Sequence, residues 1–180
     1  VSVGLAFRRA RLRYAYMLLR GKDLETQRFS AEVQEKNLTS FRDALSIVTN
    51  LNNWHTFMNI MANAGYLRKS LVSSENAVVF SYMLYLIGKT QFGVKPLELR
   101  KIMSRFIFMA TISGYFTGSP ESTVESLLTD MRSLSTSEDF INLLDREITT
   151  KFTDDYFNSN LPSDLISSST EPTVSDKRRL

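Results

Sequence analysis

The chain has 180 residues, of which 43% are apolar, and this is enough for one domain with a substantial buried core. It contains no cysteine, which excludes disulfide bonds and thiolate metal sites and fits a reducing, cytoplasmic location. The formal net charge at pH 7 is +3. The most apolar run, Ala77 to Gly88, is shorter than the stretch of about 20 residues that spans a membrane, so we expect no membrane partner.

Apolar residues recur at three- and four-residue steps along most of the chain, whereas alternating strand patterns are absent. This periodicity predicts an all-α fold, a compact bundle of about seven or eight helices. We assign residues 1–161 to a single helical domain and residues 162–180 to a polar tail. The sequence starts without an initiator methionine, so we expect a fragment of a larger protein.

The first half of the chain is predicted to form three helices. The first has an apolar face made by Leu5, Leu12, Ala15, Tyr16 and Leu19. Gly21 is its expected end, and residues 22–36 are expected to form a loop or the exposed start of the next helix. The second helix is amphipathic, with apolar residues at Leu38, Phe41, Leu45 and Val48. Asn53 is expected to cap the third helix, and Gly65 to end it.

A very apolar helix is predicted next, capped by Ser73 or Ser74 and closed by Gly88. Because it is apolar on most sides, we expect it to lie at the centre of the bundle. Pro96 is expected at the first position of the following helix. The apolar stripe of that helix comprises Leu99, Ile102, Met103, Phe106, Ile107 and Ala110.

The segment Thr117–Pro120 is predicted to separate two helices, with Gly118 ending one and Ser119 capping the next. The core face of the new helix is expected at Val124, Leu127, Leu128, Met131 and Leu134. Thr136 or Ser137 is expected to cap a further helix, which carries Phe140, Leu144 and Ile148. A short helix is expected to start at Thr153.

Positive charge is concentrated at the start of the chain, where residues 1–22 hold six basic residues and no acidic residue. The six are Arg8, Arg9, Arg11, Arg13, Arg20 and Lys22. On one continuous helix, Arg9, Arg13 and Arg20 share one side, and such a stripe can neutralise phosphates of a nucleic acid. The alternative is a solvated face, or one paired with residues 120–176, which hold twelve acidic and three basic residues.

Two further charged or titratable residues lie in apolar surroundings. Arg105 stands between Met103 and Phe106, and we expect it to pair with a carboxylate rather than to bind a ligand anion. His55 follows Trp54 at a helix start, and no local motif supports a metal site or a Ser-His-Asp arrangement. We therefore expect His55 to lie at the surface or to be partly packed.

Four acidic residues, Asp145, Glu147, Asp154 and Asp155, could supply carboxylate ligands for a metal ion. Adjacent aspartates after a threonine are explained more simply by the preference for acidic residues at a helix start. We therefore assign no catalytic, cofactor-binding or metal-binding residue, and no cofactor.

Residues 76–82, 105–110 and 114–122 carry a pattern in which an arginine precedes aromatic residues and a tyrosine-glycine-serine turn follows. In this pattern the chain resembles the bacterial family called "domain of unknown function 262". The motif positions are Arg105, Tyr115, Gly118 and Ser119, and we expect them to be structural. Phe116 departs slightly from the family's spacing. Residues 144–169 look like the continuation of such proteins.

The resemblance implies a larger parent protein. Members of this family usually begin with a ParB/sulfiredoxin-like domain that bears an Asp-Gly-Gln-Gln-Arg motif implicated in nucleotide hydrolysis. Many end with a His-Asn-His-type nuclease domain, and the better-understood relatives act against phage by cutting modified DNA. This chain has no Asp-Gly pair and only one histidine, so it lacks both motifs.

We therefore expect a non-catalytic helical module of a restriction-like, phage-defence protein, which couples a nucleotide-hydrolysing domain to DNA handling. Its expected partners are the missing N- and C-terminal domains and DNA. Two alternatives stay open. One is a protein-interaction module whose charge gradient selects the partner, and the other is a DNA-contacting domain that uses the N-terminal arginines. The sequence does not indicate the oligomeric state.

Overall fold

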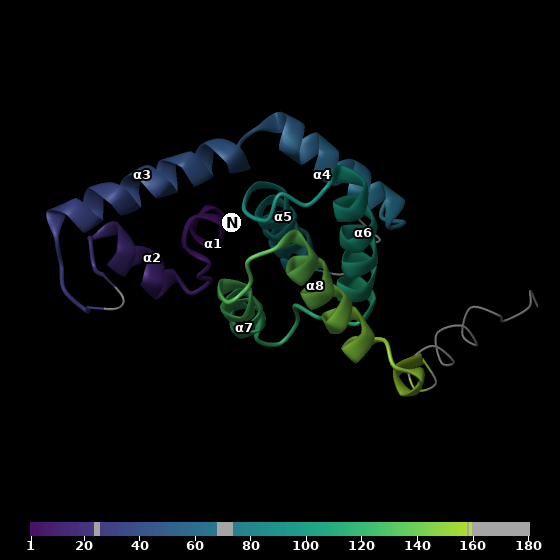
Figure 1. Cartoon of the computed structure of the whole chain (residues 1–180). Helices are drawn as coiled ribbons and strands as arrows, with labels where there is room; N and C mark the ends of the chain where they lie inside the picture. Colours follow the sequence, from purple (N-terminus) through teal and green to yellow (C-terminus); the bar gives the residue numbers. More distant parts are fainter. Residues whose placement is uncertain (24–25, 68–73, 158, 160–180) are drawn as a thin grey trace, which may run out of the picture.

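The computed structural model describes residues 1–23, 26–67, 74–157 and 159. Within these residues the protein is compact and all-α, as predicted, with nine helices, of which seven have at least seven residues, and no strand. Eight of them are α1 (Ser2–Phe7), α2 (Leu12–Leu19), α3 (Ala31–Val48), α4 (Leu51–Asn63), α5 (Glu75–Thr90), α6 (Pro96–Ile112), α7 (Pro120–Arg132) and α8 (Ser137–Lys151) (Figure 1). The ninth is the predicted short helix after Thr153.

The predicted domain boundary after residue 161 and the predicted polar tail lie outside the described residues, as does Ser73. No described helix is long and apolar enough to cross a membrane.

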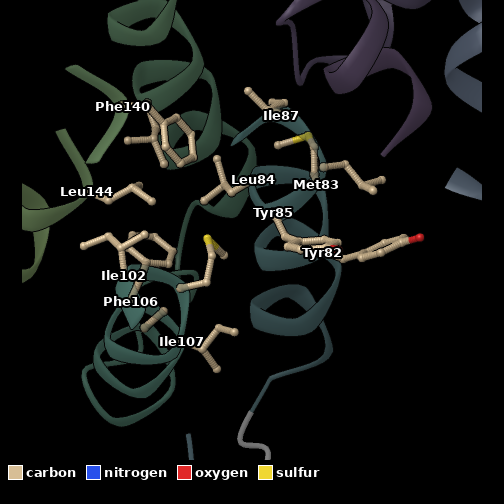
Figure 2. Packing of buried hydrophobic residues seen from close by; sticks show 14 of the residues in the cluster. Tyr82, Met83, Leu84, Tyr85, Ile87, Ile102, Phe106, Ile107, Phe140 and Leu144 are labelled. Carbon is tan, nitrogen blue, oxygen red and sulfur yellow. The ribbon is translucent and has the colours of Figure 1, made fainter. Parts of the chain in front are cut away.

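Helix α5 forms the centre of the core, as its apolar sequence predicted. Ser81 to Gly88 are buried without interruption. Figure 2 shows Leu84 of α5 directed toward Ile102 and Phe106 of α6 and Leu144 of α8. The apolar stripes predicted for α6, α7 and α8 are buried here, apart from the half-buried Leu134.

The remaining helices surround α5 in two groups (Figure 1). Helices α3 and α4 form a long bent arm, with α1 and α2 beneath α3, and α6, α7 and α8 close the other side of the bundle. The Tyr82 hydroxyl of α5 donates a hydrogen bond to the Val48 carbonyl at the end of α3 over 2.9 Å. This bond ties the arm to the central helix.

The prediction of one continuous first helix is wrong. The chain forms α1 and α2 instead, and it turns at Arg8, whose backbone is left-handed with φ of 49°. The Arg8 N–H donates to the Gly4 carbonyl and closes α1. Tyr16, which was expected on the apolar face of that helix, is exposed to solvent over 62% of its surface. Gly21, with φ of 82°, follows the end of α2 as expected.

The cap predicted for α4 is also wrong. Asn50 is the N-cap, and its side-chain oxygen accepts a hydrogen bond from the Asn52 N–H. Asn53 is buried, and its side-chain amide donates to the Ile47 carbonyl while its oxygen accepts from Lys89 Nζ at 2.6 Å. Inside the helix, both the N–H and the C=O group of the buried Asn53 side-chain amide have hydrogen-bond partners. Burial of this polar side chain is therefore tolerated.

Two predicted helix ends lie elsewhere. Helix α6 ends at Ile112 rather than at Gly118. The turn that leads into α7 contains Gly114 and Gly118, both of which have positive φ angles. Ser119 is the N-cap of α7 as predicted, without a side-chain capping bond. Helix α5 passes through Gly88 and continues to Thr90.

Gly88 is required by packing rather than by a helix end. A Cβ atom there would lie 2.7 Å from Phe140 Cε1 and 2.8 Å from Leu99 Cδ1, and both of these side chains are buried. The substitution Gly88→Ala should therefore lower the free energy of unfolding by about 1–2 kcal/mol, although alanine is the better helix former. Urea unfolding followed by circular dichroism measures the change. Asn76→Ala at an exposed position of α5 is the control, and a gain in stability for Gly88→Ala would contradict this packing.

Candidate anion-binding surface

The six N-terminal cations do not form one stripe. Arg8 belongs to the turn between α1 and α2, and its side chain is directed at the protein. It donates to the Met131 carbonyl at the end of α7 and to Gln91 Oε1, and its guanidinium lies 4.8 Å from the centre of the Phe92 ring. Burial lowers the pKa of Arg8. These contacts hold the turn in place, and the role of Arg8 as a nucleic-acid contact stays a prediction from the sequence.

Arg9 pairs with the acidic end of the molecule. Its Nη1 lies 3.4 Å from Glu125 Oε1 of α7, and Arg132 Nη1 lies 3.7 Å from the same oxygen. The other oxygen of Glu125 accepts the Ala10 backbone N–H at 2.6 Å. Glu125 is only 12% exposed. Arg9 precedes the first residue of α2, so it does not share a helix side with Arg13 and Arg20 as the sequence suggested.

Arg13 and Arg20 are exposed, beside the half-buried Tyr14 and the exposed Tyr16. The guanidinium of Arg13 lies 5.0 Å from the centre of the Tyr14 ring, and that of Arg20 lies 5.3 Å from the Tyr16 ring. Arg20 also donates to the Tyr16 hydroxyl at 2.6 Å. We call Arg13, Tyr14, Tyr16 and Arg20 the arginine-tyrosine face. Arg11, the N-cap of α2, is partly exposed beside it.

A second basic feature, which we call the basic cleft, lies between α1, α2, α3 and the end of α7. Its volume is about 420 Å³. It is lined by Phe7, Arg9, Leu18, Lys22, Asp23, Val33, Lys36, Asn37 and Arg132. Lys22 was predicted from the N-terminal cluster. Lys36 and Arg132 were not among the predicted basic residues, because they come from distant parts of the chain and no local sequence pattern joins them to Arg9.

Arg105 pairs with a carboxylate, as predicted. Its Nη1 lies 2.6 Å from Asp145 Oδ1 of α8. However, 57% of the Arg105 side chain is exposed, so the pair lies at the surface of α6 rather than in the apolar interior that the neighbouring residues suggested. Such a pair contributes little to stability because water screens it.

Tyr115 joins the end of α6 to α8. Its hydroxyl donates a hydrogen bond of 2.6 Å to Glu147 Oε2, and the Lys151 ammonium lies 5.7 Å from the centre of its ring. Burial, and next to it the bond to Glu147, raise the pKa of Tyr115 well above its ordinary value of 10.0. Gly118 and Ser119, two other motif positions, lie in the turn before α7.

The other candidate residues do not come together. His55 is exposed on α4. Asp154 and Asp155 are exposed at the start of the last short helix, while Asp145 and Glu147 bind Arg105 and Tyr115. Among the described residues, no group of three or more histidine, aspartate or glutamate side chains is placed to hold a metal ion.

No protein-family model, no curated protein and no solved structure matches the chain. The resemblance to the domain of unknown function 262 therefore stays a prediction from the sequence.

The Tyr115–Glu147 bond has a pH signature. In the unfolded chain the hydroxyl loses its proton near its ordinary pKa of about 10, whereas the folded protein retains it, so stability falls as the pH rises above about 10. Tyr115→Phe should lower the free energy of unfolding by about 1–2 kcal/mol at pH 7, because Glu147 loses a partner. Above about pH 10, the variant should lose stability less steeply than the wild type.

Urea unfolding at several pH values measures both effects. Tyr82, Tyr85 and Tyr66 also have pKa values raised chiefly by burial, so part of the alkaline slope remains in the variant. Tyr16→Phe on the exposed face of α2 is the matched control. An alkaline slope identical to that of the wild type would contradict the role assigned to Tyr115.

Proposed function

We propose that the chain is a non-catalytic helical module that binds nucleic acid through the arginine-tyrosine face of α2. The observation that carries this proposal is the exposure of Arg13 and Arg20 beside Tyr14 and Tyr16. Neither arginine has an ion pair within the described part of the chain. Their positive charge is therefore available to a partner.

The residue types suit a phosphate backbone with bases beside it. A guanidinium carries five N–H donors in a planar fork, and the tyrosine hydroxyls use only part of this set. Tyrosine rings can stack on bases, and arginine adds to that stacking through cation–π attraction. Positions 13, 16 and 20 follow three- and four-residue steps, so Arg13, Tyr16 and Arg20 lie along one side of the helix.

The substitution of both arginines by glutamine tests the proposal. Each lost phosphate contact should reduce the slope of log K against log salt concentration by about 0.9 for duplex DNA, so Arg13→Gln/Arg20→Gln should reduce it by about 2 and weaken binding. Fluorescence anisotropy with a labelled duplex at several salt concentrations measures the slope. The control is Arg100→Gln/Lys101→Gln, which removes the same charge from exposed positions of α6.

Binding and a salt slope that are unchanged in the α2 variant would exclude the arginine-tyrosine face as the contact. Salt-insensitive capture of a protein, without retention of DNA, would favour the protein-interaction module instead.

We further propose that this module belongs to a restriction-like, phage-defence protein and couples a nucleotide-hydrolysing domain to DNA handling. The resemblance of residues 76–131 to the domain of unknown function 262 supports this setting, together with the missing catalytic motifs in the chain. Sequencing the gene on both sides should reveal an upstream Asp-Gly-Gln-Gln-Arg motif in the same reading frame. A flanking sequence without that motif would count against the setting, but it would leave the DNA-binding proposal standing.

A further inference from the structure

The basic cleft holds more positive charge than the surrounding fold neutralises. Arg9, Lys22, Lys36 and Arg132 line it, and Asp23 is the one acidic residue among its described lining residues. None of the ion pairs within the described chain involves Lys22 or Lys36. Four cations that line one hollow repel one another, and an anion placed among them relieves this repulsion.

Glu125 does not remove the excess. It is a single carboxylate that faces two guanidiniums, those of Arg9 and Arg132, at 3.4 Å and 3.7 Å. Burial, and next to it the positive charge of Arg9, lower the pKa of Arg132. Glu125 therefore holds Arg9 and Arg132 in place from one side. The two arginines carry two positive charges and Glu125 carries one negative charge, so one positive charge is left over.

Arg9 has donors to spare. A guanidinium has five N–H groups, and the bonds of Arg9 within the described residues use only Nη1. Its ring contact with Tyr14, at 4.9 Å from the guanidinium carbon to the ring centre, restrains the side chain further. An arginine that is restrained and still has unused donors is preorganised to bind an oxyanion in a bidentate way.

The cleft also has an apolar part. Phe7 of α1, Leu18 of α2 and Val33 of α3 line it together with the cations. The volume of about 420 Å³ falls within the range of about 300–1,000 Å³ that is typical of pockets for small organic ligands. A bare inorganic ion would leave the apolar lining uncovered.

We propose that the basic cleft binds a phosphate monoester, with the phosphate among Arg9, Lys22, Lys36 and Arg132 and the organic part against Phe7, Leu18 and Val33. Free nucleotides and the 5′-phosphate end of a nucleic-acid strand both present this group. The cleft adjoins the arginine-tyrosine face through the contact between Arg9 and Tyr14, but its lining contains no residue of that face. The proposed site does not depend on the nucleic-acid binding proposed for that face.

The first experiment is isothermal titration calorimetry of the full chain with adenosine 5′-monophosphate, with adenosine and with inorganic phosphate. The monophosphate should bind at least about tenfold more tightly than either of the other two, because only it engages both the charged and the apolar lining. Adenosine binding as tightly as the monophosphate would overturn the assignment of a phosphate site. Inorganic phosphate binding as tightly would overturn the role of the apolar lining.

The second experiment places the site. Lys36→Gln should weaken binding of adenosine 5′-monophosphate about fivefold, since it removes one cation from the cleft. Arg42→Gln, on the same helix but outside the cleft lining, should leave binding unchanged. Equal weakening in both variants would mean that general charge, not the cleft, binds the ligand. Lys36 is exposed, so the substitution should leave the fold intact, and a wild-type unfolding curve for Lys36→Gln verifies this.

The third experiment distinguishes the two sources of the phosphate. A short DNA strand with a 5′-phosphate is compared with the same strand without it, on the wild type and on Lys36→Gln. If strand ends are the source, the 5′-phosphate should strengthen binding in the wild type, and by a smaller factor in the variant. If the free nucleotide is the source, the strand's phosphate should add nothing, and excess adenosine 5′-monophosphate should leave strand binding unaffected. In either case, Arg13→Gln/Arg20→Gln should retain the affinity for the monophosphate. The proposal for the basic cleft and the proposal for the arginine-tyrosine face can therefore be refuted independently of each other.

Discussion

The burial of the second half of α5 on all sides is the constraint on which the rest of this structure depends. Eight consecutive residues, Ser81 to Gly88, are removed from solvent, so no single partner helix can cover them. Phe140 of α8 packs against Gly88, and Gly4 of α1 lies so close to Met83 that a Cβ atom would overlap the methionine sulfur. The bundle closes around this part of α5 from several directions, because Ser81 to Gly88 leave no side of the helix to water.

The same packing determines where the basic groups lie. The short α1 is held against α5, and the chain leaves it through the turn at Arg8, which is bonded to the end of α7. Helix α3 is joined to α5 through the Tyr82–Val48 hydrogen bond. The cleft therefore forms between elements that the core positions independently of any ligand. Its geometry is a consequence of folding, and a ligand entering it need not order the surrounding helices.

Local periodicity was sufficient to predict the buried stripes of α6 and α8 and the central place of α5, since those features depend on neighbouring residues along the chain. It failed where a residue's partner is distant. Asn53 was expected to be a cap, because the sequence does not reveal Lys89 beside it. Arg9 was assigned to a helical stripe, because its pairing with Glu125 spans more than a hundred residues. The basic cleft was missed for the same reason.

The arginines and lysines of the N-terminal region divide according to what the fold requires of them. The Arg8 side chain donates hydrogen bonds to the Met131 carbonyl and to the Gln91 side chain, so a structural role accounts for this arginine. Glu125 needs one cation as a partner and has two, and a second partly buried guanidinium is costly to retain without a compensating anion. Lys36 adds further charge to the same hollow without serving the core. The requirements of folding therefore account for Arg8, but they do not account for the excess positive charge of the basic cleft. A phosphate bound in the cleft would account for that charge.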